Sequence, residues 1–112
     1  MKVKINELNG VPLDWAVTKA LGYNHDYRSK TPEHWGMHGW ATKWEQGGPI
    51  IQEWCIGLEY AEMGSENDWC AFCGTSSTVA CGGPTPLIAA MRAFVAFQLE
   101  ASEIEVPKGL IA

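Results

Sequence analysis

The sequence predicts a single α+β domain that spans residues 1–112, with two main helices packed on a small, mostly antiparallel sheet. Hydrophobic residues make up 46% of the 112 residues and charged residues 19%, so the chain has enough apolar material for a core. Two segments, at about residues 12–21 and 86–98, have the periodicity of helices, and four short segments have the composition of strands. No linker or charge block divides the chain, which favours one domain.

The first predicted helix begins at Pro12, a residue suited to the first helical position, and stops at Gly22, a good left-handed cap. Trp15 falls on its polar face, beside Asp14. We therefore expect Trp15 either to be covered by another segment or to be offered to a partner. The apolar face is formed by Leu13, Ala16, Val17, Ala20 and Leu21.

The second predicted helix is the strongest local signal in the sequence. Thr85 can act as its N-cap, and Pro86 follows in the first turn. The helix is apolar on nearly every side, which predicts that it is the central core element. Arg92 is the exception and needs a polar partner, because an unpaired buried charge is costly. We expect a buried ion pair between Arg92 and Asp14 of the first helix.

Four short segments are predicted to form strands, and two Gly-Gly-Pro elements are predicted to form turns. Glycine permits unusual backbone angles and proline starts the next element, so Gly47-Gly48-Pro49 and Gly82-Gly83-Pro84 are typical of turns. The middle of the chain, about residues 23–80, is otherwise expected to be irregular. The predicted strands are Val3–Ile5, Ile50–Ile56, Trp69–Cys73 and Ile104–Val106.

The net charge, the lengths of the apolar runs and the first residues argue against several classes of function. The net charge is −5, which argues against nucleic-acid binding and against docking on anionic lipid. Residues 44–91 contain no Lys or Arg, so this acidic stretch forms either a solvated surface or a face for a basic partner. No apolar run is long enough to cross a membrane, and the first residues do not resemble a signal peptide. We therefore expect a cytoplasmic protein.

Six tryptophans in a short chain, three of them close together, predict a contact surface for a macromolecule. Tryptophan is enriched at the hot spots of protein interfaces, so we expect a surface centred on Trp15, Trp35, Trp40 and Trp44. The alternative interpretation is that these residues cover a small core. The partner would be another protein, and self-association through the alanines of the second helix is also compatible with the sequence.

A zinc site is the second candidate. His34 and His38 are four residues apart and would share one face of a short helix, while Cys70 and Cys73 form a C-x-x-C pair. Two imidazoles and two thiolates make a tetrahedral zinc set, structural or hydrolytic. The spacing between the two pairs is not that of a standard zinc finger, and buried cysteines also occur as small hydrophobes. The leading hypothesis therefore includes no cofactor.

Catalytic motifs give little support to an enzyme. The polar run at residues 75–78 is not a nucleophile elbow, and phosphate-binding glycine motifs are absent from the sequence. We name no catalytic residue. A small-molecule-binding protein with an aromatic pocket is a third hypothesis.

Three blocks of sequence occur in an order that resembles a known family. They are Leu13–Val17 with Lys19 and Ala20, then Gly47–Ile51, then Thr85–Arg92. The pattern is similar to that of small phage and prophage proteins of unknown function, encoded among the accessory genes of tailed bacteriophages, and it spans roughly residues 1–98. The resemblance implies a viral or prophage origin and a location in the host cytoplasm, so the expected partner is a host or phage protein. It implies no activity, and no metal or thiol role.

Overall fold

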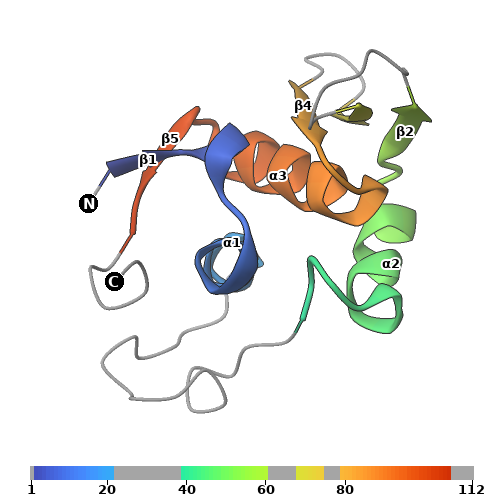
Figure 1. Cartoon of the computed structure of the whole chain (residues 1–112), viewed down its shortest axis with the longest axis horizontal. Helices are drawn as coiled ribbons and strands as arrows, with labels where there is room; N and C mark the ends of the chain where they lie inside the picture. The colour runs from blue at the N-terminus through green and yellow to red at the C-terminus, as the bar shows by residue number, and fades with distance from the viewer. Residues whose placement is uncertain (1, 22–38, 61–67, 75–78, 107–112) are drawn as a thin grey trace.

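A computed structural model describes residues 2–21, 39–60, 68–74 and 79–106. The helix α3 runs through the middle of the molecule, with a three-stranded antiparallel sheet on one side and the helices α1 and α2 on the other sides (Figure 1). The elements are β1 (Lys2–Lys4), a short 3₁₀ helix η1 (Ile5–Glu7), α1 (Gly10–Ala20), α2 (Trp44–Glu53), β2 (Gly57–Tyr60), β3 (Trp69–Cys73), β4 (Val79–Gly83), α3 (Pro86–Leu99) and β5 (Glu103–Glu105). The predicted α+β class with mostly antiparallel pairing is confirmed.

The helix α3 is the core element that the sequence predicts. Its N-cap is Thr85, whose hydroxyl accepts a hydrogen bond from the Ile88 N–H at 3.1 Å. It ends at Glu100, which takes the left-handed conformation of a helix C-cap. Every residue from Ala89 to Ala96 is buried. The alanines allow close packing, since a Cβ added to Gly83 of β4 would lie only 2.7 Å from the Ala89 nitrogen.

The helix α1 buries the face that its sequence predicts and part of its polar face as well. Trp40 Nε1 donates a hydrogen bond to Thr18 Oγ1 at 3.0 Å, and the Ala41 N–H donates to Asp14 Oδ1 at 3.1 Å. Residues 40 and 41 therefore lie across the side of α1 that would otherwise face water. Trp15, the exception in the predicted pattern, is buried on this helix.

The helix α2 corrects the predicted strand at Ile50–Ile56 and the predicted turn at residues 47–49. Gly47 and Ile50 form its buried face, and Trp54 at the C-cap continues that face with ring-centroid distances of 5.5 Å to Phe94 and 6.4 Å to Phe97. These positions are three and four residues apart, the spacing of one helix face. Pro49 has no N–H to donate to the carbonyl oxygen of Glu45, four residues earlier. Both residues are exposed, so this carbonyl can bond to water instead.

The strands form two sheets. Trp69–Cys73 is a strand as predicted and lies between β2 and β4 in the order β2-β3-β4. The predicted end strands pair with each other, Val3 of β1 opposite Ile104 of β5. The middle of the chain is therefore less irregular than expected, because α2, β2 and β3 all lie within it. None of the helices in the described residues has the length and apolar character needed to cross a bilayer.

Arg92 does not pair with Asp14, and this prediction is wrong. The Arg92 side chain donates to the carbonyl oxygens of Leu8 at 2.7 Å and of Gly82 at 2.9 Å. It thereby links α3 to the start of α1 and to β4. Burial lowers the pKa of the guanidinium, and the nearby Cys81 and Glu7 raise it. Asp14 is instead held by the Ala41 amide.

Candidate binding surface

Three tryptophans of the predicted contact surface, Trp15, Trp40 and Trp44, lie within the described residues, and they do not form one surface. Trp15 is only 6% exposed and Trp40 only 9%, so the structure corrects their assignment and places both in the core. Trp40 lies against α1, where its Nε1 donates a hydrogen bond to Thr18 Oγ1. Trp44 is 54% exposed and keeps its place as a candidate contact residue. Trp35 lies outside the described residues.

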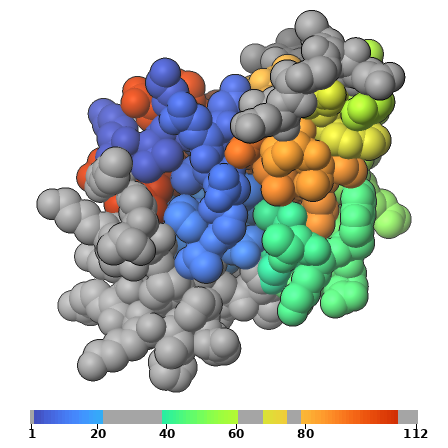
Figure 2. All heavy atoms as spheres, in the orientation of Figure 1, coloured from blue at the N-terminus to red at the C-terminus, as the bar shows by residue number. Residues whose placement is uncertain are grey.

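The exposed large hydrophobic side chains of the described residues are Trp44, Leu58 and Tyr60. Trp44 is the first residue of α2 and lies against Gly48 one turn later, whereas the other two belong to β2. The two elements follow each other along one side of the molecule, the green side in Figures 1 and 2. We call this the α2–β2 surface, defined by Trp44, Glu45, Glu53, Leu58, Glu59 and Tyr60.

The strand β2 is an edge strand, and all four of its residues are exposed. Leu58 and Tyr60 point to one face of the sheet, because alternate residues of a strand share a face. The centroids of the Tyr60 and Trp69 rings are 5.0 Å apart, so the Tyr60 ring packs against Trp69 on one side and is exposed on the other. Neither residue is among the contact residues predicted from the sequence. The alternation in Gly57-Leu58-Glu59-Tyr60 was the available signal, but a four-residue pattern is weak.

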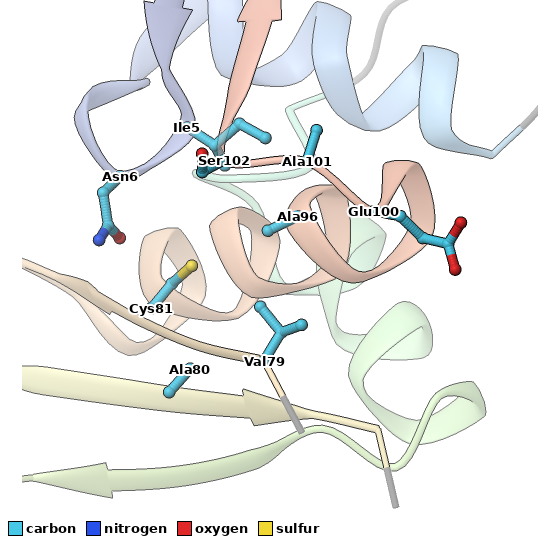
Figure 3. Close-up of a pocket in the computed structure, with 9 residues that line it drawn as sticks. All are labelled: Ile5, Asn6, Val79, Ala80, Cys81, Ala96, Glu100, Ala101 and Ser102. Carbon is cyan, nitrogen blue, oxygen red and sulfur yellow. The ribbon is translucent and has the colours of Figure 1, made fainter. Parts of the chain in front are cut away.

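A groove of about 380 Å³ lies beside β4, between η1 and the end of α3 (Figure 3). The Val79 and Cys81 side chains point from β4 toward α3, while that of Glu100 points away. None of the groove's nine lining residues is aromatic, so it is not the aromatic pocket of the small-molecule hypothesis. The lining residues are Ile5, Asn6, Val79, Ala80, Cys81, Ala96, Glu100, Ala101 and Ser102.

The C-x-x-C pair is placed on a strand, which separates its two thiols. Cys70 and Cys73 are three residues apart in β3 and therefore face opposite sides of the sheet. A zinc site needs both sulfurs on one side, so the strand conformation does not suit a shared ion. The described residues contain no group of three or more potential metal ligands, and His34 and His38 lie outside them. Burial raises the pKa of the Cys73 and Cys81 thiols.

Asp14 is a partly buried carboxylate on α1 whose pKa is raised well above its ordinary value. Burial raises its pKa from 3.8 to about 6, although the hydrogen bond from the Ala41 N–H opposes that increase. The folded protein therefore binds the proton more tightly than the unfolded chain does. The contribution of Asp14 to stability therefore falls as the pH rises from about 4 to about 6, because the charged form is the one that burial penalises.

Replacing Asp14 with Asn is expected to increase stability at pH 7. The amide oxygen can still accept the Ala41 hydrogen bond, and no charge has to be desolvated. We expect a gain of about 1–2 kcal/mol, after allowing for the partial exposure of the carboxylate. Urea unfolding at pH 4 and pH 7 measures the difference, with Glu45→Gln on the exposed side of α2 as the control. Equal gains at the two pH values would contradict the assignment.

Comparison with known proteins identifies the family. No curated protein matches the chain. A family model described as "Bacteriophage P22, NinX" matches residues 4–98, which include α1, α2, the three-stranded sheet and nearly all of α3. The match contains the three blocks that resemble small phage proteins. The chain therefore belongs to the bacteriophage P22 NinX family.

Proposed function

We propose that this phage protein is a non-enzymatic binding protein that contacts a host or phage protein through the α2–β2 surface. The observation that carries the proposal is the exposure of Trp44, Leu58 and Tyr60 on two consecutive elements. The core does not need these side chains, because other apolar residues fill it. Large aromatic side chains left in water are typical of contact sites, where they supply area at a low entropic cost.

The shape of the surface suits a macromolecule better than a small ligand. Trp44 is in the first turn of α2 and Tyr60 is the last residue of β2, and these two elements follow each other along one side of the molecule (Figure 1). A small molecule could touch only one of these elements, whereas a protein or an extended peptide could touch both. The cytoplasm of the infected host is the expected location of such a complex.

Removal of the two aromatic side chains is expected to abolish partner capture without unfolding the protein. We expect the Trp44→Ala, Tyr60→Ala double variant to recover at least tenfold less partner than the original chain. The measurement is affinity capture from phage-infected cells, with quantification of the captured proteins by mass spectrometry. Gln98→Ala, an exposed position on α3, is the matched control.

Thermal unfolding of the same variants separates a lost contact from a lost fold. The double variant should unfold within a few degrees of the original protein, since both side chains are about half exposed. Undiminished capture by the folded double variant would refute the role of this surface. If no protein is captured in larger amounts by the original chain than by the double variant, the proposed function itself is refuted.

A further inference from the structure

We infer that β2 accepts an added strand from its partner, and that the added strand is an extended segment rich in Lys or Arg. The inference rests on the proposed function, because it names the chemistry of the partner at the α2–β2 surface. Two features of the described residues support it, the open edge of β2 and the alternation of its side chains, together with the distribution of charge along the sequence.

The open edge supplies main-chain hydrogen-bonding groups. Among the described strands, β2 pairs on one side with β3 and with no strand on the other. An edge strand presents unpaired N–H and C=O groups, which an extended peptide can satisfy by lengthening the sheet. The opposite edge of this sheet is different, because Arg92 bonds the Gly82 carbonyl of β4. The described structure therefore closes part of one edge and leaves the other open.

The alternation of side chains defines what the added strand must carry. Leu58 and Tyr60 face one side of the sheet, so they would contact apolar side chains of the partner. Glu59 faces the other side, next to Cys70 and, one strand further, Gly82. Both of these neighbours are small, and the larger Phe72 on the same face is opposite Gly57, so a basic side chain can reach the Glu59 carboxylate. An alternating pattern of apolar and basic residues fits both faces.

The charge distribution specifies a basic partner. Residues 44–91 contain six acidic residues and no Lys or Arg. The carboxylates Glu45, Glu53 and Glu59 are exposed on the α2–β2 surface. A segment bearing Lys or Arg gains from these charges. An acidic segment would be repelled.

A peptide of defined sequence tests the inference. The probe is an acetylated and amidated nonapeptide in which valine and arginine alternate. Its binding to the full chain is measured by calorimetry and by the amide NMR shifts of residues 57–60. Two comparison peptides replace arginine with glutamate, or carry N-methyl groups on alternate residues so that one peptide edge cannot form hydrogen bonds. We expect the arginine peptide to bind and each comparison peptide to bind at least tenfold more weakly.

Variants of the protein locate the contact. We expect Glu59→Arg to weaken binding of the arginine peptide at least tenfold and Glu59→Gln to weaken it by a smaller factor. Glu103→Arg makes the same change of charge in β5, on the other sheet, and should change the affinity less than twofold. Hydrogen exchange of those amides of residues 57–60 that do not bond to β3 should slow when the peptide binds, because an added strand protects the edge.

The outcomes distinguish this inference from the proposed function. Equal affinity for the N-methylated peptide would overturn strand addition, and equal affinity for the glutamate peptide would overturn the basic partner. Failure of the arginine peptide to bind would overturn the inference as a whole. If partner capture from infected cells still depended on Trp44 and Tyr60 in that case, the proposed function would stand without it.

Discussion

Replacement of Arg92 with Met is expected to lower the free energy of unfolding by about 2–4 kcal/mol, because it leaves two carbonyl groups without their donor. The Arg92 side chain is 4% exposed, and its hydrogen bonds to Leu8 and Gly82 link segments far apart in the sequence. Methionine restores much of the volume but none of the donors. The loss is smaller than the sum of two strong hydrogen bonds, since the variant no longer buries a charge.

Urea unfolding at pH 7 measures this effect. Arg92→Lys should fall between Met and the original residue, because an ammonium group cannot reproduce the planar geometry of the two bonds. Gln98→Met, on the exposed side of the same helix, is the control for the change in helix composition. A loss below 1 kcal/mol for Arg92→Met would show that water replaces the guanidinium at both carbonyls.

Gly47→Ala is expected to destabilise the protein by about 2–4 kcal/mol, although alanine is the better helix former. A Cβ on Gly47 would lie 2.7 Å from Leu87 Cδ1 and would overlap the Trp40 carbonyl oxygen. The carbonyl belongs to the segment that covers α1, so the clash cannot be relieved by one side chain alone. We expect α2 to be pushed away from α3 and the Trp40–Thr18 hydrogen bond to lengthen.

Gly48 provides the matched comparison, one residue later in the same helix. A Cβ at this position meets only Trp44 Cε3, at 3.9 Å. Gly48→Ala should therefore stabilise the protein by about 0.5–1 kcal/mol through the backbone entropy of the unfolded chain. If α2 packs as described, thermal and urea unfolding should show that Gly47→Ala lowers the free energy of unfolding and that Gly48→Ala raises it. The same sign for both would contradict the close approach at Gly47.

The opposite behaviour of these two glycines shows why part of the fold was predictable and part was not. The caps and apolar periodicity of α3 are local, so the sequence predicts it from Pro86 almost to its last residue. The segment Gly47-Gly48-Pro49 carries local turn signals, but the contact of Gly47 with Trp40 and Leu87 is a tertiary interaction. Close packing of α2 selects the helix, and no local pattern contains that information.

The candidate surface was predictable to a smaller extent. The polar position of Trp15 indicated that something unusual covers α1, but periodicity cannot say whether the cover is a partner or another part of the same chain. In the structure, Trp40 bonds to Thr18 and Ala41 bonds to Asp14, so part of the polar face of α1 is covered by the same chain. Exposure of Trp44 and Tyr60 depends on which elements pack beside them, which again is a property of the whole fold.

The pairing of β1 with β5 has a consequence for the order in which the molecule assembles. The β3–β4 hairpin and α3 lie close together in the sequence, so they can form early with little loss of chain entropy. Val3 and Ile104 are opposite each other, and their contact closes a loop of nearly the whole chain. On the ribosome, this small sheet can therefore form only after β5 has emerged, so we expect it to form after the hairpin and α3 rather than before them.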